Sequence, residues 1–387
     1  MSYSTSSFLF SVFLFSLLTA PSDSYSTWLK ELNLPRQLLE YHVSTNPEHR
    51  ERCIQDPECK FDLNITKCFG FEPDCMMNNS LVTRSKFTKC DKNLNPKVAS
   101  TFFRQGDFGY LDSRLVKHQI CSSDDPNGSQ LSCSDDLTHC TGNNLYFDFS
   151  NLKAKTSKRY REDVIQAGQV GGNCAIIDKK MLEENGKVKG YLMGWADELQ
   201  HFESNSEFQV SDEFCDVVFE RPTVIMKLDA AINLYHHFCD FLNLYASLHL
   251  NQTFNQDIDI VWWDTHPEGF IDKMYGVTWK AFSKHKPFEL KDLDQKRVCF
   301  KNVMMPLLAR QRNGLFYNSY LGQGCSGSTL FRSFSQFILH RLGIKPARAD
   351  AEKVRIVILS RSTAFRRILN IKEVSKNLCI YRLDINK

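Results

Sequence analysis

The sequence predicts an α/β fold with parallel strands, preceded by a cysteine-rich N-terminal region. Short β-branched runs at 223–228 and 257–264 flank a long segment with helical periodicity at 233–250. A strand, a helix and a strand with short connections form a βαβ crossover, which implies parallel strands. Eight of the 14 cysteines lie before residue 141, a density typical of secreted, disulfide-bonded proteins.

Further elements extend this pattern towards the C-terminus. A β-branched run at 215–220 predicts another strand, and 329–342 predicts an amphipathic helix that Gly343 ends. The run at 353–362 predicts a buried strand, and a helix is expected from residue 371. The strand and helix after residue 350 look like the opening of a second doubly wound domain.

The N-terminus predicts a secretory signal peptide over residues 1–24. The apolar stretch Phe8–Ala20 carries no charge and is shorter than the roughly 20 residues of a membrane-spanning helix. An uncleaved signal anchor is the alternative, because no Lys or Arg precedes the stretch. We divide the rest into a cysteine-rich region at 25–142, a Rossmann-like domain at 143–350 and the start of a second such domain at 351–387.

The cysteines and glycosylation sequons both indicate an oxidising, glycosylating compartment. Zinc is the alternative for clustered cysteines, but the chain has no Cys-x-x-Cys pair. Four Asn-x-Ser/Thr sequons are present, at Asn64, Asn78, Asn127 and Asn251.

Overall composition excludes one class of partner. The 387 residues carry a formal net charge of +3, with 24% charged residues. This balance offers no basic surface for nucleic acid. The tripeptide Asp107-Phe108-Gly109 also occurs in protein kinases, but no other kinase motif accompanies it.

The stretch "NLYHHFCDFLNLY" at 233–245 is the strongest candidate site. At about 100° per residue its polar side chains gather on one helical face; they are Asn233, His236, His237, Asp240 and Asn243. Three interpretations are open: a solvated face of an amphipathic helix, a zinc site, or an active-site stripe. Zinc is disfavoured because adjacent histidines point about 100° apart, unlike the His-Glu-x-x-His arrangement.

The position of this stripe favours a functional site. In parallel sheets, ligand-binding and catalytic residues lie beyond the carboxyl ends of the strands. Asp229 follows one predicted strand, Asp264 and Thr265 end the next, and Ser360–Ser362 end the strand at 353–362. All of these residues are therefore expected at one edge of the sheet.

The same segments resemble a known family. "MKLDAAINLYHHFCDFLNLY", "VWWDT", "RNGLFYN" and "ILSRSTAFRRILN" are similar to the EGF-domain-specific O-linked N-acetylglucosaminyltransferases of the secretory pathway, which are related to plant β-1,2-xylosyltransferases. The resemblance covers about residues 50 to 372. It implies transfer of N-acetylglucosamine from UDP-GlcNAc to Ser or Thr of EGF-like domains in the endoplasmic reticulum. It also implies a GT-B-like architecture with two Rossmann-like domains.

An inverting transfer needs a base for the acceptor hydroxyl and cations for the leaving diphosphate. Asp240, His236 or His237 is the expected base, with His236 preferred because it lies nearest Asn233 and Asp240 on the helix. The expected donor-binding residues are Arg361, Ser362, Thr363 and Arg366. Surface ion pairs with Glu373 or Asp350 are the alternative for the two arginines.

The chain departs from the family in two places. The family's Asp-Tyr-Asp element falls on Lys284, His285 and Lys286, so a divalent metal is unsupported there; Asp257-Ile258-Asp259 is a weak substitute. After Val354 the chain is also shorter than the roughly 100–150 residues of a Rossmann-like domain, and the family's C-terminal retention signal is not found. We therefore expect a C-terminally truncated second domain, impaired transfer and passage through the secretory pathway without retention.

Two other functions compete with catalysis. One is a catalytically inactive protein or fragment that binds EGF repeats. The other is a secreted, disulfide-rich structural glycoprotein, which would not need the polar stripe at 233–243.

Overall fold

The computed structural model describes residues 26–63, 89–90, 94–112, 114–186, 194–271, 275–311, 315, 324–345, 358 and 367–377. The α-helices are α1 Thr27–Glu31, α2 Arg36–Thr45, α3 Pro47–Gln55, α5 Pro96–Gly106, α6 Gly109–Asp112, α7 Lys179–Asn185, α8 Ala196–Leu199, α9 Leu234–Leu250, α10 Thr329–Arg341 and α11 Ile371–Asn377. Short 3-10 helices are η1 Asp135–Leu137, η2 Ala154–Thr156, η3 Gly276–Ala281 and η4 Leu290–Leu293. The strands are β1 Lys89–Cys90, β2 His118–Ser122, β3 Gln130–Cys133, β4 Cys140–Asp148, β5 Val170–Gly172, β6 Ile176–Ile177, β7 Phe202–Ser204, β8 Val217–Phe219, β9 Thr223–Lys227, β10 Asp259–Trp263, β11 Phe288–Glu289, β12 Arg297–Met305 and β13 Cys325–Ser326.

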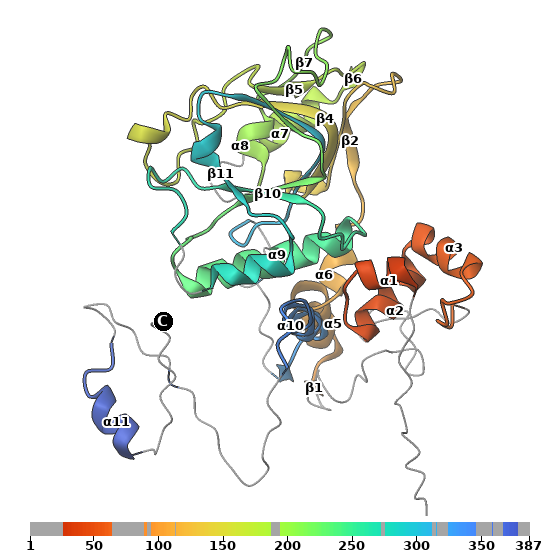
Figure 1. Cartoon of the computed structure of the whole chain (residues 1–387), viewed down its shortest axis with the longest axis vertical. Coiled ribbons are helices and arrows are strands. Elements are labelled where there is room, and N and C mark those ends of the chain that lie inside the picture. The colour runs from red at the N-terminus through yellow and green to blue at the C-terminus, as the bar shows by residue number, and fades with distance from the viewer. Residues whose placement is uncertain are drawn as a thin grey trace, which may run out of the picture.

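A mixed sheet of eleven described strands forms the centre of the molecule (Figure 1). Its main path runs β11-β10-β9-β12-β4-β3-β2-β6. Strands β9, β10 and β11 are parallel, and β12 is parallel to both β8 and β9. The pairing becomes antiparallel where β12 meets β4 and stays so through β3, β2 and β6.

The predicted βαβ crossover is confirmed. Strand β9 leads into α9, which returns to β10, and Thr223 to Lys227 pair in parallel with Asp259 to Trp263. Both strands are buried along their whole length, as expected for parallel strands covered on both faces. The sheet as a whole is mixed rather than purely parallel, because β12 pairs along nearly its whole length with the antiparallel strand β4.

The cysteine-rich region contributes directly to this sheet. Strands β2 and β3 lie within 25–142, and β4 crosses the predicted boundary between residues 142 and 143. The C-terminal part of this region shares the main hydrophobic core with β9, β10 and β12. Local periodicity did not reveal β2 and β3, because they are only five and four residues long.

The predicted disulfide bonding is confirmed. The described bonds are Cys53–Cys59, Cys121–Cys174, Cys133–Cys140 and Cys215–Cys299. Cys239 is a buried free thiol in α9.

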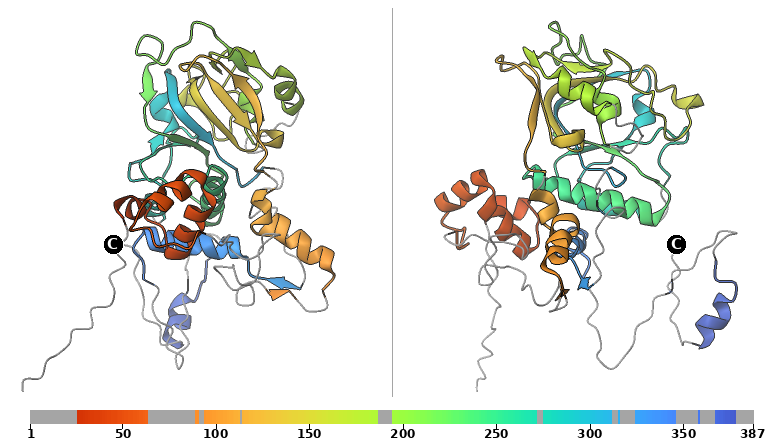
Figure 2. Two further views of the ribbon diagram at one scale, coloured as in Figure 1. Left: turned by 90° about the vertical axis from the view of Figure 1, so that its right-hand side faces the viewer. Right: turned by 180° about the vertical axis from the view of Figure 1, so that it is seen from behind.

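Helix α9 lies along the sheet (Figures 1 and 2). Helices α5, α6 and α10 lie on the side of α9 that faces away from the sheet. The predicted helix at 329–342 corresponds to α10. Its N-terminus is held by the buried Asp107, whose carboxylate accepts the backbone N–H groups of Thr329 at 3.0 Å and Leu330 at 2.8 Å. Gly343, with φ of +64°, follows its end.

The other C-terminal predictions have different outcomes. The helix expected from residue 371 is α11. The predicted signal peptide at 1–24 lies outside the described residues, and so does the predicted strand at 353–362 apart from Ile358. Among the helices that are described, none combines the length and apolar character needed to cross a bilayer.

Candidate functional site

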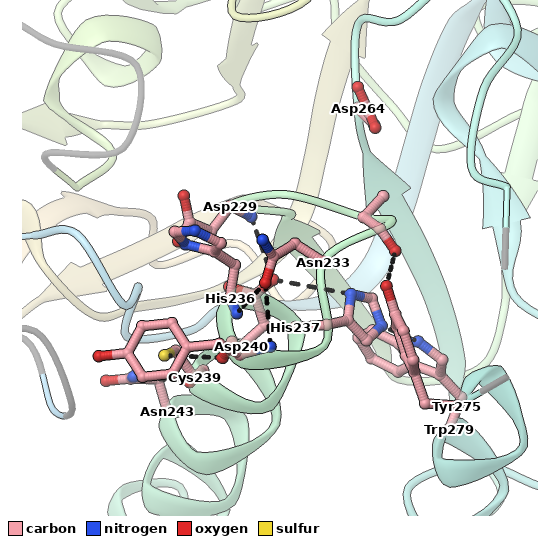
Figure 3. Close-up of polar contacts among 12 residues, drawn as sticks. Asp229, Asn233, His236, His237, Cys239, Asp240, Asn243, Asp264, Tyr275 and Trp279 are labelled. Carbon is pink, nitrogen blue, oxygen red and sulfur yellow. Dashed lines mark hydrogen bonds and ion pairs between the residues drawn. The ribbon is translucent and has the colours of Figure 1, made fainter. Parts of the chain in front are cut away.

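The turn between β9 and α9 brings the candidate residues together. Asn233 caps α9: its side-chain oxygen accepts the backbone N–H groups of Tyr235 at 3.1 Å and His236 at 3.4 Å. This cap fixes where the helix begins, and so places His236 in the first turn, facing the end of β9. The turn from Leu228 to Asn233 carries Asp229 into the same space (Figure 3).

Asp229 and His236 form an acid–imidazole pair. Nδ1 of His236 lies 2.7 Å from Oδ2 of Asp229. The Asp229 side chain is 1% exposed, whereas the His236 side chain is 24% exposed. A carboxylate that accepts the Nδ1 proton leaves the lone pair on Nε2. His236 is therefore held as a base on the solvent side of a buried carboxylate.

Arg310 approaches the same carboxylate from a different strand end. Its Nε lies 2.7 Å from Oδ1 of Asp229, and it follows the carboxyl end of β12, which is parallel to β9. Burial raises the pKa of Asp229, while the charges of Arg310 and His236 act to lower it. Burial dominates, so the pKa of Asp229 is raised overall, and the adjacent Arg310 guanidinium favours its ionised form against that effect.

Asp240 lies directly behind this pair. Its Oδ2 accepts the backbone N–H of Asp229 at 3.0 Å, and the residue is 1% exposed. Burial, and then the neighbouring charge of Asp229, raise the pKa of Asp240 well above its ordinary value. Two nearby carboxyls in a dry site do not both ionise readily, so Asp240 is the one that keeps its proton. Its contact holds the backbone of Asp229 in place.

His237 has a different environment from its neighbour. Its Nε2 accepts the indole N–H of Trp279 at 2.8 Å, and the residue is fully buried. The ring also packs against Phe241, Phe270 and Tyr275. Because the Nε2 lone pair is already used, the neutral ring carries its proton on Nδ1, which lies 4.0 Å from Asp240 Oδ2.

Two loops complete the rim of the site. Asp264, at the end of β10, pairs with Arg159 at 3.2 Å, and the hydroxyl of Tyr160 donates to the backbone carbonyl of Asp229. On the opposite side, the Tyr275 hydroxyl donates to the carbonyl of Ala231 at 2.7 Å (Figure 3). The predicted gathering of Asp229, Asp264 and the α9 residues at one sheet edge is thereby observed.

The described residues hold no group of three or more side chains suited to a metal ion. Asp257 instead pairs with His285 at 2.6 Å on the surface, and Asp259 pairs with Arg221 at 2.9 Å. Both carboxylates of the Asp257-Ile258-Asp259 segment are therefore engaged in protein ion pairs. The chemistry available at the β9–α9 turn is proton transfer through His236, supported by Asp229.

Comparison with known proteins identifies the family. No family model matches the chain. An EGF domain-specific O-linked N-acetylglucosamine transferase from Xenopus laevis is 40% identical over 359 residues, which cover 90% of this chain and 67% of the frog protein. The Gallus gallus protein of the same name is 39% identical over 93% of this chain and 68% of its own length, and the Drosophila melanogaster protein is 39% identical over 88% and 66%. The chain belongs to this glycosyltransferase family.

The chain spans about two thirds of the length of these transferases. Of the residues expected in a transferase site, the structure brings Asn233, His236, His237 and Asp240 into one cluster. The interpretation of the stripe as a solvated helix face is wrong, because His237, Asp240 and Asn243 are buried. Asn243 donates to the carbonyls of Cys239 at 2.8 Å and Leu315 at 3.1 Å. The four donor-binding candidates Arg361, Ser362, Thr363 and Arg366 lie outside the described residues.

Sequence reasoning missed Arg310, Trp279 and Tyr160 as members of this site. For Arg310 a signal existed: it comes after the run "RVCFKNVMM", whose two apolar, β-branched blocks predict a buried strand, and parallel strands share one functional edge. For Trp279 and Tyr160 no local signal exists, because their contacts span 42 and 69 residues of sequence.

Two of the four sequons lie in the described structure. Asn127 is exposed in the loop between β2 and β3, and Asn251 directly follows α9, where it is half-buried. Asn64 and Asn78 lie outside the described residues.

Proposed function

We propose that this chain transfers N-acetylglucosamine from UDP-GlcNAc to Ser or Thr hydroxyls of EGF-like domains, with inversion at the sugar carbon. The names of the related transferases supply the reaction and the acceptor class. The Asp229–His236 pair carries the proposal for the site, since it is a base with a buried supporting carboxylate at the functional edge of the sheet.

In the proposed mechanism, Nε2 of His236 takes the proton from the acceptor hydroxyl. The oxygen forms a bond to C1 of the sugar, and the bond between C1 and the UDP oxygen breaks, so that the electron pair leaves with UDP. Asp229 stabilises the imidazolium that forms, and Arg310 keeps Asp229 ionised before the step. Asp240 acts through Asp229, as a positioning residue.

The leaving diphosphate needs positive charge, and we assign this role to Arg361 and Arg366, with hydroxyl contacts from Ser362 and Thr363. The wider GT-B-like architecture with a second nucleotide-binding domain belongs to the same proposal. The proposed compartment is the lumen of the secretory pathway, which the disulfides support.

The test is a transfer assay with UDP-GlcNAc and a folded EGF repeat, following UDP release and the mass of the acceptor. The matched variants are His236→Ala and His285→Ala; His285 also pairs with an aspartate, but on the surface away from the site. Loss of a general base lowers the rate by about 100-fold or more, so only His236→Ala should lose activity. Binding of the EGF repeat without any transfer by the parent chain would instead favour the inactive binder, and equal rates for both variants would reject His236 as the base.

A further inference from the structure

A cavity lies at the other end of α9, away from the proposed catalytic site. It has a volume of about 640 Å³, within the range of roughly 300–1,000 Å³ typical of sites for small organic molecules. Its walls come from α1 and α3 on one side and the loop after α9 on the other. The cavity lining includes Trp28, Glu31, Glu48, Arg52 and Asn251.

The wall chemistry suits a sugar better than an apolar ligand. Carboxylates, a guanidinium and amide groups surround one indole, which its hydrogen bond to Asp56 at 2.7 Å holds in place. The guanidinium of Arg52 lies 4.8 Å from the centre of that indole. Neutral sugars carry hydroxyl and amide groups that such mixed donors and acceptors can bind, together with apolar ring faces.

The cavity also opens at a modification sequon. Asn251-Gln252-Thr253 is one of the sequons of the chain, and all three residues line the cavity. The side chain of Asn251 is partly exposed and makes no hydrogen bond within the described part of the chain. A sugar attached to its amide nitrogen would therefore begin at the cavity wall.

The loop that follows α9 also contacts the N-terminal helices. Asn46 donates to the carbonyl of Gln252 at 3.0 Å, and Asn33 donates to Gln256 at 2.9 Å. Arg341 of α10 joins both sides, since its guanidinium donates to the carbonyls of Leu32 and Phe254. Figures 1 and 2 show α1, α2 and α3 together beside α9 and α10. A group in the cavity would touch both the helices and the loop.

We infer that Asn251 carries an N-linked glycan whose first N-acetylglucosamine units occupy this cavity and fasten α1–α3 to the end of α9. In the attachment step the amide nitrogen of Asn251 bonds to C1 of the first sugar. The bond from C1 to the diphosphate of a lipid-linked oligosaccharide breaks, and the amide loses a proton. The inference rests on the secretory location proposed above but not on transfer activity.

The test uses the full chain expressed in a glycosylating secretory host. Glycopeptide mass spectrometry measures occupancy at Asn251 and at the exposed Asn127, which does not line this cavity. Digestion of the native protein with a peptide N-glycosidase then measures how accessible each glycan is. Release from Asn251 should be roughly tenfold slower than from Asn127, because the seated sugar must first leave the cavity.

Matched variants distinguish a glycan bound in the cavity from one that is attached but lies in solvent. Arg52→Ala should keep occupancy at Asn251 but raise the release rate to that of Asn127, while Arg50→Ala, on the same helix but outside the cavity lining, should not. Thr253→Ala should lower the melting temperature by about 2–4 °C. Thr253→Ser, which keeps the sequon, and Asn127→Gln, which removes the exposed sequon, should leave it near the parent value.

Each other outcome overturns the inference. If Asn127 is modified and Asn251 is not, the proposed secretory compartment is supported, and the proposal of a glycan in the cavity is rejected. If both are occupied and released equally fast, the Asn251 glycan lies in solvent. If neither is modified, the proposed compartment fails together with the inference, and the transfer assay is judged separately.

Discussion

Trp279 donates its indole N–H to Nε2 of His237 across 2.8 Å. This contact separates two histidines that are adjacent in sequence. The Nε2 lone pair of His237 accepts a hydrogen bond from a buried tryptophan. Nδ1 of His236 instead contacts Asp229, and the His236 side chain is partly exposed. One histidine is therefore part of the core, and its neighbour is the one that we propose as the base.

The first prediction concerns this division. His237→Ala should lower the free energy of unfolding by about 2–4 kcal/mol, because it leaves a cavity among aromatic rings and a buried indole donor without its acceptor. Transfer at a temperature where the variant is folded should stay within a few-fold of the parent. Thermal unfolding and initial rates measure the two effects, and His236→Ala should give the opposite result: lost rate with little change in melting temperature. A collapse of the rate in folded His237→Ala would contradict this assignment.

The second prediction concerns Asp229. Asp229→Asn should lower the transfer rate by about 100-fold or more, since a neutral amide neither stabilises the imidazolium nor pairs with Arg310. The control is Asp257→Asn, which breaks a similar aspartate–histidine pair on the surface, where Asp257 is 61% exposed and His285 is 35% exposed. Steady-state rates for the two variants decide the matter, and comparable losses would show that the buried pair has no special role.

The third prediction concerns the pH dependence of stability through Asp240. Burial and the charge of Asp229 raise the pKa of Asp240 above its ordinary value of 3.8. Its contribution to stability is therefore fully present below about pH 4 and is lost as pH rises towards the folded-state pKa, by at most about 1.4 kcal/mol per pH unit. Asp240→Asn is permanently neutral, so its stability relative to the parent should increase between pH 4 and pH 7.

Asp257→Asn is the opposite control in the same series. The hydrogen bond from His285 lowers the pKa of Asp257, so the parent should have a small, constant stability advantage over this variant above about pH 4. It should lose that advantage only as pH falls below about 4, and the effect is small because the pair is exposed. Denaturant unfolding at several pH values measures both trends. A stability difference for Asp240→Asn that does not change with pH would show that Asp240 is ionised in the folded protein.

The fourth prediction concerns the donor side and comes from the sequence alone. Arg366→Gln should lower transfer by roughly 10- to 150-fold, corresponding to about 1.5–3 kcal/mol for one lost charge-assisted contact to the diphosphate. Arg367→Gln is the matched control, since Arg367 is exposed. Titration with UDP should show weaker binding only for Arg366→Gln, and unchanged UDP affinity would assign Arg366 to a surface ion pair.

The local elements were accessible from the sequence because their signals are local. The periodicity of 233–250 predicted α9, the β-branched runs predicted β9 and β10, and Gly343 marked the end of α10. The parallel crossover followed from the order of these elements. The cysteines predicted disulfides, although their pairing could not be deduced from spacing.

The mixed character of the sheet was not accessible in this way. Strand β12 pairs with β4, β8 and β9, and these partners lie far from it in sequence. Pairing of this kind depends on which strands meet in the folded chain, which no short window of sequence records.

By itself, the sequence determined that Asn233, His236, His237 and Asp240 share one face of a helix at the functional edge of a parallel sheet, and that the chain resembles its transferase family. Only the tertiary structure decided what each residue does there. The roles depend on partners from distant segments: Trp279 for His237, the buried backbone of Asp229 for Asp240, and Arg310 with Asp229 for His236. Helical periodicity fixes the direction of a side chain, but burial and hydrogen bonding set its protonation and reactivity, and these arise only when distant segments pack together.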